Sequence, residues 1–452
     1  MTCAPFSASK LTAEAVVGTT TPLGVSMAAQ GKVPGLATRL LALRLLQRID
    51  EEGAWLSRIL GVEAERSGLN ASDKSLLLNI CQTVLRRRPA LLYVIRGCAR
   101  QGKVPDQVAQ ILEVAMVQML FMDRIPDHAA VDLAVRSARR AGLNKATGLI
   151  NGILRRVGRE KADWAKRFER EQKGALMGPA PAQLYGRWCQ RMGVPKAAAL
   201  QRALGRPATV EARIDKETCE HWCELIGATP IEGMATHMQL PPGAPDKLKG
   251  FSDGAWSVQD RNAARIVPLL PLGGSKVADL CAAPGGKTVQ LAQRFPKSEV
   301  VAIDLHEHRA GLLRQALDRC GCSARVEVGD AIELCPQLGP FDRIVLDAPC
   351  SGLGTLRRHP EIAGRSRLAA LGDNAALQAR LLSAAIDALS PGGVLIYSVC
   401  SLEPQEGELV IEQALRSGLV QLVDGPDLPG GQGCFGLDGE GDGFFVARLE
   451  KI

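Results

Sequence analysis

The chain lacks any uninterrupted apolar run long enough to cross a bilayer, and its first thirty or so residues lack the charged-then-apolar order of a secretory signal. We therefore expect a cytoplasmic protein with no membrane partner. At 452 residues, 46% of them hydrophobic, the chain is long enough for two or three domains that each bury a core.

The cysteines lack the arrangement of a disulfide framework. There are thirteen, an odd number, and they are scattered from Cys3 to Cys434 in a large chain, so we expect most of them to be reduced. Cys219, His221 and Cys223 lie close enough in sequence to suggest a metal site, but no second pair of ligands follows at a finger-like spacing. We expect no metal.

The segment Val277–Thr288, VADLCAAPGGKT, lacks the glycine spacing of two common nucleotide-binding loops. A phosphate-binding loop requires glycine five residues before Gly286, where this chain has Cys281, and the spaced glycines of the dinucleotide fingerprint are missing too. The segment still predicts a strand, a tight turn and a helix start. Glycines in such a turn, and free N–H groups at the helix start, let a ligand approach the main chain closely.

The patterns that are present divide the chain into four parts. Residues 1–34 mix small residues and proline without periodicity, which indicates a disordered tail. Residues 35–162 have helical periodicity and predict an all-α domain, in which one helix is capped by Asn70–Asp73 and runs through Leu85 and another starts at Pro105 and runs through Met122. Residues 163–250, interrupted by prolines, are interpreted as a connecting subdomain with a β-like run at Thr209–Arg213. Residues 251–452 alternate strands with helical runs such as Glu307–Arg319.

Positive charge is concentrated at the end of the helical part. Between Val131 and Arg170 there are eleven basic and four acidic residues, an excess equal to the formal net charge of +7 of the whole chain. A solvated helix face would be the simplest explanation, but such a concentration favours a polyanion, with nucleic acid first. We expect four arginines to contact RNA phosphates: Arg139, Arg140, Arg155 and Arg156.

The last 200 or so residues predict an open, mainly parallel sheet with right-handed crossovers, closed by an antiparallel pair at Val420–Val423 and Phe444–Leu449. The five expected parallel strands are Lys276–Leu280, Glu299–Ile303, Arg325–Val328, Arg343–Leu346 and Val394–Ser398. The fold class is thus a Rossmann-like α/β domain preceded by an all-α domain.

Chemically suggestive residues follow each parallel strand, where such sheets bind ligands. They are Cys281–Lys287, Asp304, Asp330, Asp347 with Cys350, and Cys400. One carboxylate after a strand is often a helix cap, but five such positions in succession indicate a site.

A nucleoside-bearing cofactor other than NAD suits this edge, and S-adenosylmethionine fits best. Asp304 lies 18 residues beyond Gly286, near the offset at which an acidic residue binds ribose hydroxyls. Asp330 is expected at the adenine edge, and the turn around Gly285 at the amino-acid end.

Two cysteines, Cys350 and Cys400, stand in polar turns at the same edge, where a thiolate can act as nucleophile. A methyl donor beside a thiolate is the chemistry that methylation of cytosine at carbon 5 requires. That carbon is too weakly nucleophilic until a thiolate adds at carbon 6.

Several motifs resemble those of RNA 5-methylcytosine methyltransferases. They are Ala282–Thr288, Asp347–Gly352, Tyr397–Ser401, Ser257–Asp260 and Asp442–Phe445. Residues His128–Val131 and Gly148–Arg156 resemble the antitermination-factor-like RNA-binding domain. Fused in this order, the two parts are similar to bacterial methyltransferases of small-subunit (16S) ribosomal RNA.

The resemblance implies that Cys400 is the nucleophile, that Cys350 assists release of the methylated RNA, and that Asp347 also faces the target cytosine. It implies a cofactor site formed by Cys281, Ala282, Ala283, Pro284, Gly285, Gly286, Lys287, Asp304, Asp330 and Asp347. Small-subunit ribosomal RNA is the expected partner, and we expect a monomer.

Two positions depart from the family pattern. Val399 precedes the nucleophile where the family usually has threonine, and Ala363-Gly364 follows Ile362 where it commonly has Lys-Trp. Two alternatives stay open: a methyltransferase acting on transfer RNA, and a non-catalytic RNA-binding assembly or antitermination factor.

Overall fold

The computed structural model describes residues 33–99, 104–214, 219–364 and 368–452. The predicted disordered tail, residues 1–34, falls almost wholly outside the described residues. The chain forms two compact units, which divide between Arg206 and Pro207; residues of the short helix η7 (Pro360–Gly364) belong to the first unit. None of the helices in the described part combines the length and apolar content that a membrane span needs.

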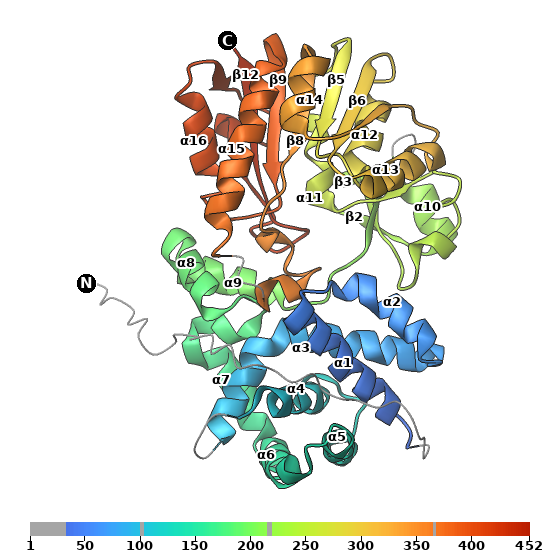
Figure 1. Cartoon of the computed structure of the whole chain (residues 1–452), viewed down its shortest axis with the longest axis vertical. Helices are drawn as coiled ribbons and strands as arrows, with labels where there is room; N and C mark the ends of the chain where they lie inside the picture. The colour runs from blue at the N-terminus through green and yellow to red at the C-terminus, as the bar shows by residue number, and fades with distance from the viewer. Residues whose placement is uncertain (1–32, 100–103, 215–218, 365–367) are drawn as a thin grey trace, which may run out of the picture. The chain divides into compact units, whose positions relative to one another are not determined.

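The first unit is helical (Figure 1), as predicted for residues 35–162, and its helices continue through α9. Its α-helices are α1 (Leu36–Glu52), α2 (Leu56–Arg66), α3 (Ala71–Cys98), α4 (Asp106–Phe121), α5 (Asp127–Arg140), α6 (Thr147–Arg159), α7 (Lys161–Arg170), α8 (Ala182–Met192) and α9 (Val194–Leu204). Four buried leucines of α1, Leu41, Leu43, Leu45 and Leu46, pack with α3 and α4 in one apolar core. Leu36 and Leu40 instead pack with Leu133 of α5.

Two helix starts in this unit follow from the sequence. Asn70 caps α3 by accepting a hydrogen bond from the Asp73 N–H, and α4 begins directly after Pro105, both as predicted. The prediction that the α3 run ends near Leu85 is wrong, because α3 continues through Pro89 to Cys98. Buried Leu91 and Val94 pack into the core and hold the helix together beyond the proline.

The second unit contains two sheets. The smaller one has the antiparallel order β2-β3-β1-β4, from strands β1 (Glu211–Arg213), β2 (Thr229–Ile231), β3 (Met234–Gln239) and β4 (Ser257–Val258). Only the first was foreseen, as a run at Thr209–Arg213. Helices α10 (Cys219–Ile226) and α11 (Arg261–Ala264) flank this sheet.

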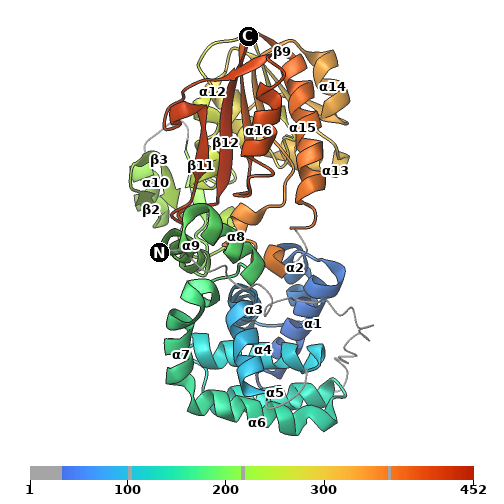
Figure 2. The ribbon, with the colours of Figure 1, turned by 90° about the vertical axis from the view of Figure 1, so that its left-hand side faces the viewer.

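The larger sheet has the order β10-β12-β9-β8-β5-β6-β7. Its strands are β5 (Lys276–Leu280), β6 (Glu299–Asp304), β7 (Arg325–Val328), β8 (Phe341–Asp347), β9 (Leu389–Val399), β10 (Val420–Leu422), β11 (Gln432–Phe435) and β12 (Phe444–Lys451). Strands β7, β6, β5, β8 and β9 pair in parallel in this spatial order, which confirms the predicted Rossmann-like sheet. The antiparallel pair of β10 and β12 is confirmed too, with β12 inserted beside β9 and with β11, which was not predicted, on β12 (Figure 2).

Alternating apolar residues cover both faces of this sheet. Val277, Val345 and Ile396 face a core that includes Leu291 of α12 (Gly286–Arg294). Ala278, Ile344 and Leu395 face the opposite core, which is covered by helices α14 (Ala331–Leu338), α15 (Leu371–Asp387) and α16 (Glu408–Leu415). Helix α13 (Glu307–Arg319) packs with α12. The period of two in side-chain direction explains why the strands could be predicted.

Candidate active site

The predicted site lies where the order of the parallel strands reverses. From β5 the chain runs outward to β6 and β7, then returns to β8 on the other side of β5. The loops after β5 and β8 therefore meet at the carboxyl edge, at the switch point where open α/β sheets bind ligands. Cys281–Lys287 lie in the first loop and the first turn of α12, while Asp347 ends β8 and Cys350 lies in the loop that follows.

The turn after β5 requires small residues. Gly285 has φ of 108°, and a Cβ there would lie 2.8 Å from Leu313 Cδ1. It is the N-cap of α12 and has no side chain to cap the helix, so the first-turn N–H groups face no capping group of their own. A Cβ on Gly286 would meet nothing nearer than Gln259 Nε2 at 4.0 Å, so the main chain is open on that side. These features suit an anionic carboxylate ligand.

Asp304, the last residue of β6, holds this turn. Its side chain is 1% exposed; Oδ2 accepts a hydrogen bond from the Ala283 N–H at 3.0 Å, and Oδ1 accepts one from the His306 N–H at 3.2 Å. Arg309 adds an ion pair at 3.5 Å. Because each carboxylate oxygen has two lone pairs, Asp304 retains acceptor capacity for a ribose hydroxyl.

Asp330 follows β7 and is the N-cap of α14, where its Oδ1 accepts a hydrogen bond from the Ile332 N–H at 2.9 Å. The simpler helix-cap interpretation therefore holds for this residue. Its role at the adenine edge stays a prediction.

Lys287 and Asp347 connect the two loops. The Lys287 ammonium lies 2.7 Å from Asp347 Oδ2, while Asp347 Oδ1 accepts a hydrogen bond from the Ser398 hydroxyl at 2.8 Å. Burial alone would lower the pKa of Lys287, but the adjacent Asp347 carboxylate outweighs it, so the pKa lies above its usual value. Lys287 is therefore a fixed cation beside the two cysteine loops.

Asp279, the penultimate residue of β5, is 1% exposed. Its Oδ2 accepts a hydrogen bond from the Thr288 hydroxyl at 2.6 Å. Burial raises the pKa of Asp279 to about 7, despite the opposing effects of Thr288 and Lys287. A carboxyl group whose pKa lies near neutrality is thus hydrogen-bonded to α12.

The two predicted catalytic cysteines are in contact. Cys350 Sγ and Cys400 Sγ lie 3.2 Å apart, each half-buried, at the ends of the neighbouring strands β8 and β9. Contact with the Cys400 sulfur, followed by burial, holds the pKa of Cys350 well above its ordinary value. Cys350 is therefore a protonated thiol that can donate to the Cys400 sulfur.

Glu406 anchors the loop that carries Cys350. It is fully buried, and its carboxylate accepts hydrogen bonds from the Ser351 N–H at 2.7 Å and the Ser351 hydroxyl at 2.5 Å. Asn374 of α15 donates to the same carboxylate at 2.9 Å. Tyr397 donates its hydroxyl to the Glu406 carbonyl at 2.6 Å, which links the anchor to β9.

Backbone hydrogen bonds also hold the loop that carries Cys350. The Gly354 N–H donates to the Cys400 carbonyl at 3.0 Å, and the Gly443 N–H donates to the Gly354 carbonyl at 2.8 Å. A Cβ on Gly354 would lie 1.9 Å from the Gly443 oxygen, so only glycine fits. The distance between the two sulfurs therefore depends on close backbone contacts among the segments that contain Gly354, Cys400 and Gly443.

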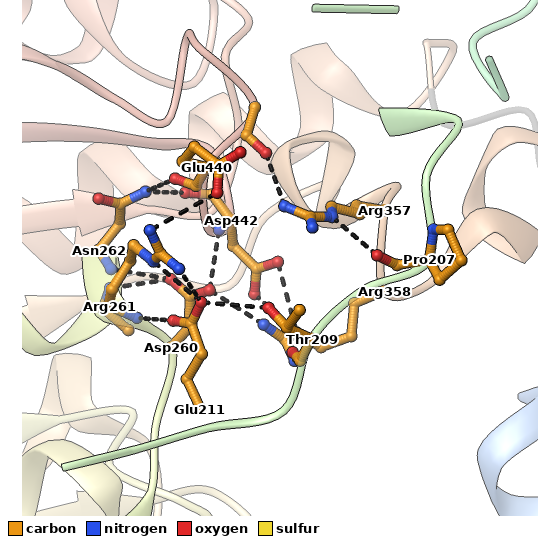
Figure 3. Close-up of polar contacts among 12 residues, drawn as sticks. Pro207, Thr209, Glu211, Asp260, Arg261, Asn262, Arg357, Arg358, Glu440 and Asp442 are labelled. Atoms are coloured by element: carbon orange, nitrogen blue, oxygen red, sulfur yellow. Dashed lines mark hydrogen bonds and ion pairs between the residues drawn. The ribbon is translucent and has the colours of Figure 1, made fainter. Parts of the chain in front are cut away.

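Beyond Gly354, Arg357 and Arg358 join segments that lie far apart in sequence (Figure 3). Arg358 binds the carboxylates of Asp260, at 2.9 Å, and Asp442, at 3.1 Å. Burial opposes its charge, but the two carboxylates raise the pKa of Arg358 above its usual value. Arg357 donates to the carbonyls of Pro207 and Gly439. The flanking motifs at Ser257–Asp260 and Asp442–Phe445 thus meet in one polar cluster.

The four predicted RNA-binding arginines lie in the helical unit. Arg139 and Arg140 end α5 and are exposed, and Arg155 lies exposed on α6; within the described residues none of the three forms an ion pair. Arg156 differs, because it pairs with Glu160 at 2.8 Å and donates to the Gly97 carbonyl at 3.2 Å. Arg156 therefore also binds groups within the helical unit, so its charge is only partly available to RNA.

The part of the chain that the structure describes places no group of three or more His, Cys, Asp or Glu side chains so that it could hold a metal ion. Cys219 and Cys223, which suggested such a site, are buried on α10 and pack in the apolar core of the small sheet.

Sequence reasoning missed Glu406, Asp279 and Arg358 as supports of the site. Asp279 and Arg358 stand inside or next to segments singled out for their motifs, so their charge at a buried position was an available signal. Glu406 follows Cys400 by six residues, and no periodic pattern marks it.

Comparisons with known proteins agree with both units. Residues 267–450 match the model described as 16S rRNA methyltransferase RsmB/F, and residues 36–159 match the NusB family. A relative from Klebsiella pneumoniae (strain 342), named ribosomal RNA small subunit methyltransferase B, is 33% identical over 91% of this chain and 98% of its own.

Two solved structures share the α/β fold. A methyltransferase homolog protein from Pyrococcus horikoshii is 28% identical, with a TM-score of 0.50 over 61% of this chain and 96% of its own. NSun6 from the same organism, solved with the ligand SFG, is 21% identical, with a TM-score of 0.53 over 60% of this chain and 98% of its own.

Proposed function

The chain belongs to the RsmB/F family of 16S ribosomal RNA methyltransferases, and from this premise we propose that it methylates carbon 5 of one cytosine in 16S ribosomal RNA through a covalent bond between Cys400 and carbon 6 of the base. The observation that carries the proposal is the contact of Cys350 and Cys400, 3.2 Å apart, at the carboxyl edge of the sheet after β8 and β9. Many methyl-transfer sites need no cysteine, whereas this reaction needs a nucleophile.

S-adenosylmethionine is the proposed methyl donor. The open turn at Gly285 and Gly286 suits its carboxylate end, and the remaining lone pairs of Asp304 suit its ribose hydroxyls. The ligand SFG, found with NSun6, is an analogue of this donor. When bound, the donor supplies an electrophilic methyl group.

The cysteines divide the covalent chemistry. The Cys400 sulfur forms a bond to carbon 6 and pushes an electron pair toward carbon 5, which then takes the methyl group while the electron pair of the broken methyl–sulfur bond stays on the donor. Solvent water takes the carbon 5 proton, the carbon–hydrogen electron pair restores the double bond between carbons 5 and 6, and the bond between carbon 6 and Cys400 breaks with its electron pair on the sulfur. Cys350, held protonated beside Cys400, is placed to assist this last step by donating to the departing sulfur.

The Lys287–Asp347 pair is proposed to hold the base. Asp347 can accept a hydrogen bond from the cytosine amino group, and its position is fixed by Lys287 and Ser398. Because Lys287 and the buried Ser398 hold the Asp347 carboxylate, its orientation is set before the base arrives.

We also propose that residues 35–162 form an RNA-binding domain, that residues 163–250 connect it to the catalytic domain of residues 251–452, and that a monomer acts in the cytoplasm, where the small subunit is assembled. The exposed arginines Arg139, Arg140 and Arg155 support the first assignment.

The test is to map 5-methylcytosine in 16S ribosomal RNA and in transfer RNA from cells with the wild-type chain, with Cys400→Ala, and with neither. One 16S cytosine should lose its methyl group in the last two. A loss confined to transfer RNA would favour the alternative substrate, and an unchanged pattern would favour a non-catalytic factor.

A further inference from the structure

A cavity of about 350 Å³ opens on the second unit, and its lining contains none of the residues assigned above to the cofactor, the cysteines or the base. It lies between the small sheet, the C-terminal half of α12 and the segment that leads into β11. A volume of this size is typical of small-ligand sites. The lining is strongly cationic: it includes Arg213, Arg265 and Arg294, with Asp427 as its one carboxylate among the described residues.

The arginines enter the cavity from three different elements. Arg213 is on β1, Arg265 follows α11, and Arg294 ends α12. Asp427 forms an ion pair with Arg265 at 3.6 Å. Because the Asp427 side chain is 78% exposed, solvent screens this pair and the lining stays cationic. The Arg265 guanidinium also covers the ring of Phe435 at 4.0 Å, which fixes its position at the rim.

Two hydrogen-bond donors in the lining have no partner within the described residues. Arg294 gives one terminal nitrogen to the carbonyls of Pro268 and Leu270, and its Nε has no acceptor. His237 is 2% exposed, and its Nε2 is unpartnered. A buried polar group without a partner costs free energy, and such a group in a cavity is normally satisfied by water or by a ligand.

The cross-strand register explains how His237 comes to the cavity. His237 of β3 lies directly opposite Arg213 of β1, so the two side chains share one face of the small sheet. Burial and the nearby Arg213 lower the pKa of His237 to about 4, so the ring is neutral at physiological pH. The Thr236 hydroxyl lies 3.3 Å from Nδ1, and in the tautomer that accepts its hydrogen bond there, Nε2 carries the proton and can donate it to a ligand oxygen.

We propose that this cavity is a phosphate-binding site that holds either a free mononucleotide or a backbone phosphate of an RNA strand. Both sources present the same chemistry, an anionic group with several acceptor oxygens that match guanidinium and imidazole donors. The inference does not rest on the methylation proposed above, because the cavity shares no residue with that site.

The experiment titrates the full-length protein with inorganic phosphate, with AMP and with a short single-stranded RNA by calorimetry, at an ionic strength held constant with chloride. The test variant is Arg265→Gln/Arg294→Gln. The matched control, Arg314→Gln/Arg325→Gln, removes the same charge from solvent-facing positions of α13 and β7. Thermal melting of each variant establishes that it is folded.

The proposal expects at least one probe to bind the wild type and the control equally and the test variant about tenfold or more weakly, as for the loss of a charged hydrogen bond. Saturation by phosphate and AMP at one site identifies a free nucleotide as the ligand. An effect confined to RNA, with a shallower salt dependence in the test variant, identifies a backbone phosphate.

Equal affinities of the test and control variants for all three probes would overturn the proposal. So would heats for phosphate and AMP that match the chloride blank, together with RNA binding that the test variant leaves unchanged. Either result would mean that the cavity holds only water.

Discussion

At the residue scale, the carboxylates at the cofactor edge have different partners within the protein. Asp304 is buried and holds the Ala283 turn, whereas Asp330 caps a helix. Sequence position alone made the two look equivalent, since each follows a strand. Their difference depends on which backbone N–H groups the fold places around them, and only the structure gives this.

Asp304→Ala and Asp330→Ala should each weaken binding of S-adenosylmethionine by about 1–3 kcal/mol while the fold persists. Asp330→Ala should also lower the free energy of unfolding by about 1 kcal/mol, because α14 loses its cap. Calorimetric titration of the donor, with Asp318→Ala on the exposed face of α13 as control, measures the first effect. Unchanged affinity in both variants would remove the cofactor assignment.

Asp279 predicts a specific pH dependence of stability. Its pKa is about 7 in the folded chain and about 3.9 in an unfolded one, so the folded chain retains a proton that the unfolded chain releases. This contribution to stability is complete below about pH 4 and is lost as the pH rises through 7. Asp279→Asn stays neutral throughout.

The unfolding free energy of Asp279→Asn relative to wild type should therefore rise by up to about 3 kcal/mol between pH 5 and pH 8. Urea denaturation of both proteins at the two pH values measures this difference. Parallel changes in the two proteins would show that Asp279 is ionised in the folded state.

At the element scale, the sequence predicted regular elements well and irregular ones poorly. The strands β5 and β7 and the helix α13 have the predicted bounds, because their apolar periodicity is uninterrupted. Strands β2 and β3 were missed because prolines and exposed residues conceal their alternation. Strand β11 was missed inside a glycine-rich segment, where pairing with β12 rather than local preference creates the strand.

Gly354→Ala tests the close approach of the loops that carry the cysteines. The new Cβ would collide with the Gly443 carbonyl, so we expect loss of methyl transfer and a stability decrease of about 1–3 kcal/mol. Gly311→Ala in α13 meets no atom within 4 Å and should be neutral or stabilising by about 0.5–1 kcal/mol. Thermal melting and a methyl-transfer assay compare the two. Full activity in Gly354→Ala would show that the loops tolerate separation.

The end of α5 and the helix α6 form the proposed phosphate contact. Replacing Arg139, Arg140, Arg155 and Arg156 by glutamine should weaken RNA binding and reduce the slope of log affinity against log salt by at most about 3, since fewer counterions are released. Arg156 should contribute least, because Glu160 already binds it. Donor affinity should not change.

The control for this test is Arg58→Gln/Arg66→Gln, which removes two exposed charges from α2 of the same unit, and it is compared with Arg139→Gln/Arg140→Gln, which also removes two. If the fourfold variant keeps the wild-type slope of log affinity against log salt, the basic segment does not contact RNA and is only a solvated helix face.

At the scale of the whole molecule, the order of the two units was predictable because their sequence patterns differ. Apolar residues recur about every 3.6 residues in the first unit, whereas the second alternates short apolar strands with helices. The edge at which the cysteines meet was predictable too, since parallel strands end on one side. The contact between the two sulfurs was not, because Cys350 and Cys400 are fifty residues apart and are held together by Glu406 and Gly354.

The central claim is that Cys400 forms the covalent bond and Cys350 releases it. Cys350→Ala should allow attack and methyl transfer but slow elimination, so an RNA–protein adduct that survives a denaturing gel should accumulate. Cys400→Ala and the double variant should give neither adduct nor methylated product. An adduct that forms in Cys400→Ala and depends on Cys350 would contradict the account and reverse the roles of the two cysteines.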